Sequence, residues 1–172
     1  MTMFNNDGTF DFNATIEVSD NEYVVLEPGN YWFTVDRVDY GTFQANPARQ
    51  KPSTIPDGCR TVEVFMSIET PAGVASVRDR FFMHQSVAWR IGAVHKCMGL
   101  IPEDEKNLQM AWDAMPGKSG VCKIKNQVQN GNTYNNVDRY IYPSKITTTL
   151  NNPPVTTIHV HQAKQNKYGG LL

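Results

Sequence analysis

Aromatic and basic side chains recur together in the segments of this chain that alternate like β-strands. In one such segment, alternation places Arg78, Arg80 and Phe82 on one face, because successive side chains of a strand point to opposite sides. Lys123 and Lys125 share one face of a later segment in the same way. Flat rings that stack on bases, beside cations that meet phosphates, are the combination that single-stranded nucleic acids require. Nucleic-acid contact is therefore the first chemistry to weigh.

Two further aromatic residues occupy the polar face of their predicted strands. Trp32 and Phe65 each lie opposite the apolar face of their segment. The competing interpretation is that both rings pack beneath a terminal segment and that the nearby cations are ordinary surface charge. We predict instead that Trp32, Phe65 and Phe82 stack on bases while the cations meet phosphates. The complete set of predicted nucleic-acid contacts is Trp32, Arg49, Lys51, Arg60, Phe65, Arg78, Arg80, Phe82, Lys123, Lys125, Tyr134 and Arg139.

Other chemistries have little support in the residues. Gly117-Lys118-Ser119 is similar to the end of a phosphate-binding loop, but Trp112 stands where that motif needs a glycine. The cysteines and histidines lack the regular spacing of metal ligands. No motif of an activated nucleophile or of paired carboxylates is present either. We therefore predict no catalytic residue, no metal and no cofactor.

Formal charge is unevenly distributed along the 172 residues. The net charge of −1 excludes a polybasic protein that binds nucleic acid through bulk charge alone. Residues 1–30 nevertheless carry six acidic and no basic side chains, whereas residues 144–172 carry three lysines and no acid. Three cysteines without framework spacing, together with the absence of a signal peptide and of a membrane-length apolar run, lead us to expect a soluble, cytoplasmic protein.

The periodicity of apolar residues predicts five strands and one or two helices. The predicted strands span residues 31–43, 60–69, 74–84, 121–128 and 133–142. The first of them changes phase near Val38, which indicates a bulge or a sharp bend. Helical spacing predicts a helix from Val87 to Met98 that Gly99 ends, and a shorter one over 103–115. Asn130-Gly131 between the last two strands is a strong hairpin signal.

Three strands, a helical region and two further strands form the element order of a mainly β, five-stranded Greek-key barrel of the OB type. An α+β sheet with helices on one face has a similar order and is the alternative. We divide the chain into an acidic N-terminal arm (1–20), an OB-like domain that binds single-stranded nucleic acid (21–143) and a flexible basic tail (144–172). The basic loop 44–58 and the hairpin loop 129–132 are expected to clamp the ligand.

With these landmarks in order, the chain resembles a family of phage-encoded single-stranded DNA-binding proteins of OB fold, formerly catalogued as a domain of unknown function. The resemblance covers about residues 10–142, and it implies an OB fold, single-stranded DNA binding and a role in phage DNA replication or recombination within the host cytoplasm. The basic tail departs from the acidic tip with which many replication single-strand binders end. The resemblance rests on Phe10-Asp11-Phe12, Glu27-Pro28-Gly29-Asn30-Tyr31, Arg80-Phe81-Phe82, Ala88-Trp89-Arg90-Ile91, Gly99-Leu100-Ile101-Pro102, Gly117-Lys118-Ser119-Gly120-Val121 and Asn130-Gly131-Asn132-Thr133-Tyr134-Asn135-Asn136-Val137.

Two classes of function follow from these observations. In the first, the chain is a non-enzymatic protein that protects or organises single-stranded DNA, with RNA as a further candidate ligand. In the second, it is a protein–protein adaptor of a replication or recombination complex, which binds its partners through the arm or the tail. A small enzyme has no motif behind it. We expect no membrane association, and the edge strands of a small barrel offer a surface for a homodimer.

Overall fold

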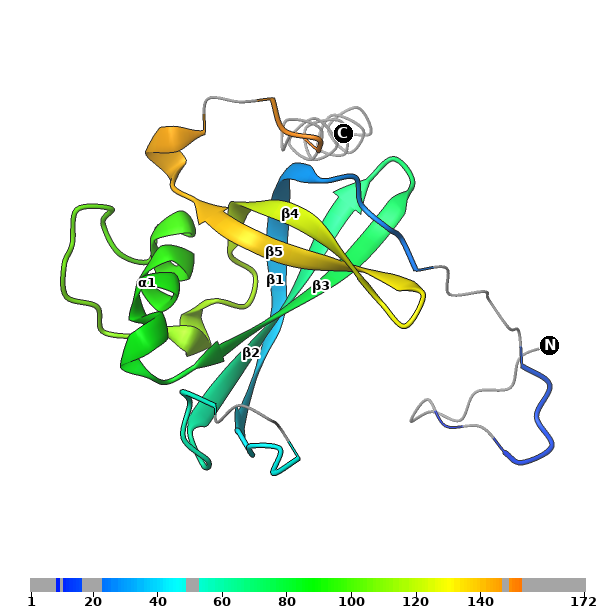
Figure 1. The fold of residues 1–172 in the computed structure, drawn as a ribbon. Coiled ribbons are helices and arrows are strands. Elements are labelled where there is room, and N and C mark those ends of the chain that lie inside the picture. Colours follow the sequence, from blue (N-terminus) through cyan, green and yellow to red (C-terminus); the bar gives the residue numbers. More distant parts are fainter. Residues whose placement is uncertain (1–8, 10, 17–22, 49–52, 147–148, 153–172) are drawn as a thin grey trace, which may run out of the picture.

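The computed structural model describes residues 9, 11–16, 23–48, 53–146 and 149–152 of the chain. Two predicted phosphate contacts, Arg49 and Lys51, lie outside the described residues, as do most of the predicted arm and residues 153–172 of the predicted tail. The described part is mainly β, with one α-helix beside the sheet (Figure 1). None of the described helices is long and apolar enough to cross a membrane.

All five predicted strands form, and they make one antiparallel sheet of order β3-β2-β1-β4-β5. The β1 strand is shared between two partners, because residues 29–34 pair with β4 and residues 34–42 pair with β2. The β4–β5 hairpin consequently crosses over the other three strands (Figure 1). The strands are β1 (Gly29–Thr42), β2 (Arg60–Thr70), β3 (Gly73–Phe82), β4 (Ser119–Gln129) and β5 (Asn132–Ile141).

A bulge in β1 explains the change of phase in its sequence. The register between β1 and β2 shifts between Val35 and Arg37, so β1 accommodates one extra residue there. Before the bulge, Tyr31, Phe33 and Val35 are buried, as simple alternation predicts. Beyond it, Arg37 stands on the opposite face, directly beside β2. The predicted bulge is therefore confirmed, and it changes which side chains of β1 face outward.

The hydrophobic core lies against the inner face of the sheet. Phe33, Phe81 and Tyr140 come from three different strands, and their rings contact one another edge-on or at a tilt, with centroids 6.0 to 6.1 Å apart. Burying each such side chain stabilises the fold by about 1.5–3 kcal/mol. In β2 the predicted alternation is confirmed, since the inward residues are at most 2% exposed: Val62, Val64, Met66 and Ile68.

The α1 helix (Ala88–Cys97) packs its apolar side into this core and ends where the sequence predicts. Ile91, Val94 and Cys97 are buried at helical spacing. Gly99 adopts a φ of +71°, a left-handed conformation that a residue with a side chain rarely takes. The amide groups of Gly99 and Leu100 then bind carbonyls of the last helical turn at 3.1 and 3.0 Å. This arrangement stops the helix.

The predicted second helix over 103–115 is wrong, since that segment contains only a short 3-10 turn, η2 (Trp112–Ala114). Three of its backbone amide groups donate to side chains instead of to the carbonyls of a helix. The Glu105 carboxylate binds the amides of the two following residues. The Ala111 amide donates to Nε2 of His95 at 3.0 Å, and this buried histidine belongs to α1. A periodic spacing of apolar residues could not show these competing bonds.

The β4–β5 hairpin turns on Asn130 and Gly131, whose φ values are +51° and +78°. Two successive residues of positive φ are the signature of a type I′ turn, so the hairpin prediction is confirmed. Gln129 and Asn132 pair directly, and the predicted four-residue loop is therefore a two-residue turn.

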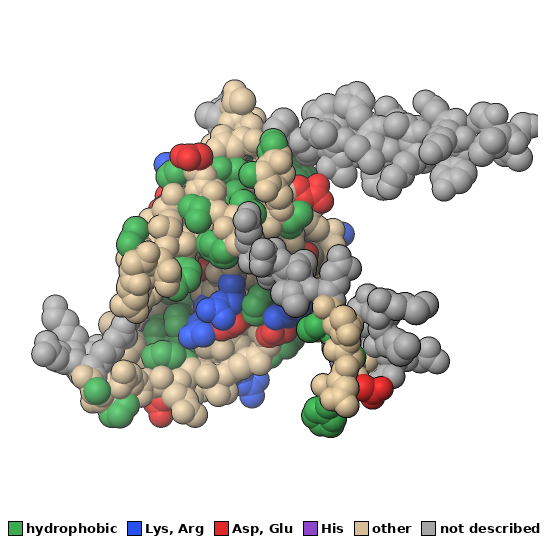
Figure 2. Space-filling view, turned by 90° about the vertical axis from the view of Figure 1, so that its right-hand side faces the viewer, with side chains coloured by type: hydrophobic (Ala, Val, Ile, Leu, Met, Phe, Trp, Pro, Cys, Tyr) green, Lys and Arg blue, Asp and Glu red, His purple; other side chains and the backbone are tan. Residues whose placement is uncertain are grey.

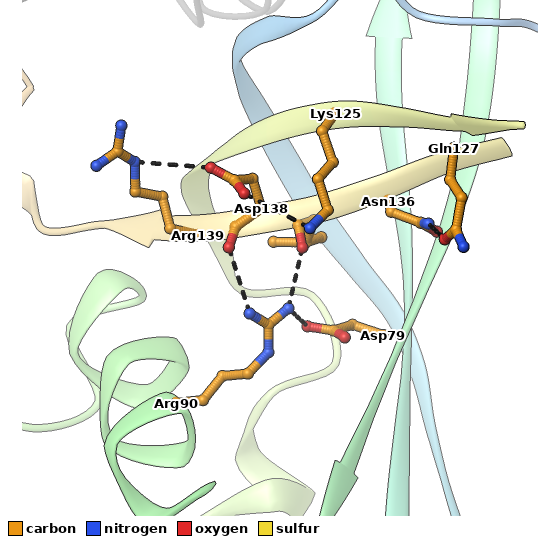
Figure 3. Close-up of polar contacts among 8 residues, drawn as sticks. Asp79, Arg90, Lys125, Gln127, Asn136, Asp138 and Arg139 are labelled. Carbon is orange, nitrogen blue, oxygen red and sulfur yellow. Dashed lines mark hydrogen bonds and ion pairs between the residues drawn. The ribbon is translucent and has the colours of Figure 1, made fainter.

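The strands β3 and β5 form the two edges of the sheet, and among the described strands no backbone ladder pairs one with the other. Side chains make the contact between these edges. Arg90 of α1 lies between the two edges and donates to the Asp79 carboxylate at 2.7 Å (Figure 3). It also donates to the carbonyl oxygens of Val137 and Asp138 at 3.1 and 3.4 Å. Tyr140 donates to Asp79 at 2.7 Å. Burial raises the pKa of the Asp79 carboxyl, and the Arg90 charge opposes that shift. We call this cluster the Arg90 bridge.

Candidate nucleic-acid interface

The outer surface of β1, β2 and β3 carries side chains in rows that cross all three strands. Directly paired residues of neighbouring strands lie close enough for their side chains to interact. The pairing brings the predicted Phe65, Arg78 and Arg80 together on this surface. We call the surface the β1–β3 outer face, and it is defined by the rows Arg37–Phe65–Arg78 and Asp39–Glu63–Arg80.

Phe65 is the aromatic centre of the β1–β3 outer face. The guanidinium carbon of Arg37 lies 3.8 Å from the centroid of its ring, and Arg78 stands directly opposite on β3. The ring is half-buried, although it points away from the core. The phenyl ring with the Arg37 guanidinium stacked against it and the Arg78 strand position beside it presents a planar, positively charged surrounding to a ligand. Arg37 is not among the contacts predicted from the sequence. A bulge before Arg37 turns its side chain to the outer face beside Phe65, so the predicted bulge was the signal that could have identified it.

The cations of this face are held by carboxylates. Glu63 accepts from Nε and an Nη of Arg80 at 2.9 and 2.6 Å, and a guanidinium nitrogen of Arg78 lies 3.8 Å away. Arg37 pairs with Asp39 at 3.4 Å. Lys and Arg side chains also lie directly beside Asp and Glu side chains in the middle of the face seen in Figure 2. Exposed pairs of this kind are worth only about 0–1 kcal/mol each, so a ligand can displace them.

One end of the β1–β3 outer face is aromatic. Phe82 meets Phe43 edge-on, with ring centroids 5.2 Å apart, and both rings are half-buried. A hollow of about 350 Å³ beside them is lined by Phe43, Glu63 and Arg80 among others. Arg60 is exposed at the start of β2, near the same end of the sheet. Phe82 and Arg60 therefore extend the surface that holds Phe65.

Lys123, Lys125 and Arg139 lie on the other two strands, apart from the rows around Phe65. Lys123 and Arg139 are directly paired across β4 and β5. Lys125 Nζ lies 3.6 Å from the Asp138 carboxylate, and Arg139 Nε lies 4.0 Å from it (Figure 3). The predicted cations thus fall into two groups on different parts of the sheet.

The two remaining predicted contacts stand outside both rows of the β1–β3 outer face. Trp32 precedes the bulge and is paired with β4. Its amide and carbonyl bind the Asn152 side chain at 2.6 and 2.7 Å, so Asn152 takes the place of a neighbouring strand there. Tyr134 packs its ring edge-on against Tyr23, with centroids 6.5 Å apart. These contacts give Trp32 and Tyr134 structural partners within the chain.

Metal binding and thiol chemistry can be checked directly in the described part of the chain. No group of three or more His, Cys, Asp or Glu residues is arranged there to hold a metal ion. The three cysteines are free thiols. Burial raises the pKa of the Cys97 and Cys122 thiols far above the ordinary value, so neither is a good nucleophile.

Two comparisons with known proteins found no match to this chain. No protein-family model matches it, and no curated protein matches it either.

Proposed function

We propose that this protein is a non-enzymatic single-stranded DNA-binding protein built on an OB-like barrel. The strand order β3-β2-β1-β4-β5, with β1 shared between β2 and β4 and the helix placed between β3 and β4, supports the barrel. The Arg90 bridge, whose side chain contacts both β3 and β5, supports closure of that barrel. The resemblance to the phage family supports a role in phage DNA replication or recombination.

The observation that carries the proposal is the row Arg37–Phe65–Arg78. An outward phenyl ring carries the Arg37 guanidinium against it and has Arg78 as its pairing partner on β3, on a sheet face that the core does not need. A base that stacks on an aromatic ring contributes about 1–3 kcal/mol to binding, and it does so for any sequence because every base has a flat face. Phe65 therefore acts as the stacking platform.

Phosphates bind next to this platform. Arg78 and Arg80 side chains are 62% and 49% exposed, and both can turn from Glu63 to a phosphate oxygen. Each cation that moves from Glu63 to a phosphate leaves the carboxylate to be solvated by water. The net electrostatic gain is consequently small, and stacking supplies the larger share of the affinity.

The experiment is a titration of 5′-hydroxyl oligo-dT into the full chain and into two variants at Phe65. Phe65→Leu keeps the apolar volume but removes the flat ring, and we expect it to weaken binding by about tenfold or more. Phe65→Tyr keeps the ring and should bind within about twofold of the parent chain. Both substitutions are on an outward side chain, so matched thermal unfolding of the variants serves as the folding control.

Equal affinity of the Leu and Tyr variants would overturn the stacking platform. Absence of oligo-dT binding by the parent chain at low salt would overturn the proposed function itself. Binding that is unchanged between low and physiological salt would contradict the phosphate contacts.

A further inference from the structure

A second hollow, separate from the β1–β3 outer face, opens between α1 and the β4–β5 hairpin. Its volume is about 720 Å³, which lies in the range of small-ligand sites. Its walls come from α1, the start of β1, β4, β5, the 3-10 turn η3 (Pro143–Lys145) and the described residues 149 and 151. We call it the α1–β5 pocket. Its chemically distinctive lining residues are Trp89, Arg90, Lys123, Arg139, Tyr142 and Lys145.

The described charged side chains that line this pocket are all positive. Lys123 and Arg139 are directly opposite each other on neighbouring strands, a placement of like charges that destabilises a sheet. No Asp or Glu is among the described residues that line the pocket. The Asp138 carboxylate lies 4.0 Å from Nε of Arg139, and it also forms an ion pair with Lys125. Lys145 adds a third cation to the lining and is exposed, so the pocket is suited to an anion.

Aromatic rings line the same pocket. Trp89 is 66% exposed, which is unusual for the largest apolar side chain, and it stands on the first turn of α1. Tyr142 is half-buried nearby in the lining, with the Lys96 ammonium 5.8 Å from the centroid of its ring. The core does not use the Trp89 ring, so it is available to a planar ligand.

We propose that the α1–β5 pocket binds a nucleoside phosphate. Lys123, Arg139 and Lys145 contact the phosphate, and Trp89 with Tyr142 contacts the base. Arg90 is committed to the Arg90 bridge and acts as a wall of the pocket. The site goes beyond the β1–β3 outer face, and its ligand comes either as a free nucleotide or as the 5′-phosphate end of a strand.

The test is calorimetric binding of dTMP to the full chain, with thymidine and inorganic phosphate as partial ligands. We expect dTMP to bind more tightly than either partial ligand, because the pocket contacts both the phosphate and the base. Lys123→Gln should weaken dTMP binding about tenfold, the size expected for one lost charge-assisted hydrogen bond. Arg78→Gln removes one cation from the β1–β3 outer face and is the matched control, for which we expect unchanged dTMP binding.

The two sources of the ligand are separated by oligo-dT with and without a 5′-phosphate. Tighter binding of the phosphorylated strand, lost in Lys123→Gln, assigns the pocket to a strand end. Equal binding of the two strands beside tight dTMP binding assigns it to the free nucleotide.

Three results overturn the pocket: no heat from dTMP, dTMP binding no tighter than inorganic phosphate, or dTMP binding that is unchanged in Lys123→Gln. Failure of the proposed function is recognised separately. It abolishes binding of the 5′-hydroxyl strand and its dependence on Phe65, and it leaves dTMP binding to the parent chain intact.

Discussion

The β1–β3 outer face and the α1–β5 pocket both carry cations that the sequence marks as phosphate contacts, yet the two surroundings differ. On the outer face each arginine of the two rows has a carboxylate within 4 Å, and Glu63 serves two of them. In the pocket, Lys123 and Arg139 face each other, and no acid is among the described lining residues.

This difference shows that the number of cations on a surface does not determine its electrostatic attraction for an anionic ligand, because nearby carboxylates reduce that attraction. A phosphate on the outer face has to compete with Glu63, so binding there depends on the half-buried, outward ring of Phe65. A phosphate in the pocket relieves the repulsion between Lys123 and Arg139. We therefore expect the β1–β3 outer face to bind an extended single strand of DNA and the α1–β5 pocket to bind a single nucleoside phosphate.

The largest expected effect comes from breaking the connection between the two regions. Arg90→Met removes the cation that links Asp79 on β3 to the carbonyls of β5, and it leaves a largely enclosed carboxylate, 14% exposed, without its charge partner. We expect the free energy of unfolding to fall by about 3–5 kcal/mol, measured by urea denaturation. Arg139→Gln, on an exposed side chain, is the control and should change stability by no more than about 0.5 kcal/mol. A loss below about 1 kcal/mol for Arg90→Met would contradict the bridge.

A smaller expected effect is a dependence of the stability of the fold on pH. His95 is fully buried, donates from Nδ1 to the Ile91 carbonyl at 2.8 Å and accepts from the Ala111 amide at Nε2. Burial lowers its pKa below the ordinary 6.5. The unfolded chain therefore binds the proton more readily, and stability should fall as pH drops below about 6.5, with a slope of at most about 1.4 kcal/mol per pH unit.

Urea denaturation between about pH 5 and pH 7.5 checks this prediction. His95→Phe removes the titrating group and should flatten the profile over the same interval. An equal slope in the parent chain and the variant would assign the pH dependence to other groups.

The smallest effect concerns the outer face alone. Glu63→Gln releases Arg78 and Arg80 from their carboxylate, and we expect affinity for 5′-hydroxyl oligo-dT to rise about twofold to fivefold, corresponding to ~0.5–1 kcal/mol. Asp138→Asn makes the same chemical change beside Lys125 and Arg139 and should leave this affinity unchanged. Fluorescence anisotropy with a labelled strand measures both. Weaker binding by Glu63→Gln would show that Glu63 positions the arginines instead of restraining them.

Much of the fold follows from local patterns in the sequence. Strand alternation identified the buried side of β2, the phase change near Val38 indicated the bulge, and Asn130-Gly131 predicted the hairpin turn. The register of the β2–β3 hairpin was also within reach. A two-residue turn at Pro71-Ala72 pairs Thr70 with Gly73, and counting back along both strands sets Glu63 opposite Arg80.

Other features depend on contacts between distant segments. The irregular course of 103–115 is set by His95, which captures the Ala111 amide, and residue spacing in that segment carries no trace of this bond. The separation of Lys123 from Phe65 follows from β1 changing partners at Thr34, just before its bulge. Strand alternation shows which face a side chain occupies, but it does not show which strands are neighbours.

The most direct test of the β1–β3 outer face is a map of the amide signals that shift when oligo-dT binds. Proton–nitrogen correlation spectra of the full chain would be recorded with increasing amounts of a 5′-hydroxyl strand of about 12 nucleotides, a length within the site sizes of OB folds. We predict that the largest shifts fall on β1 beyond its bulge, on β2 around Phe65 and on β3 around Arg78. Shifts confined to α1, β4 and β5, with Phe65 and its neighbours unmoved, would contradict the account.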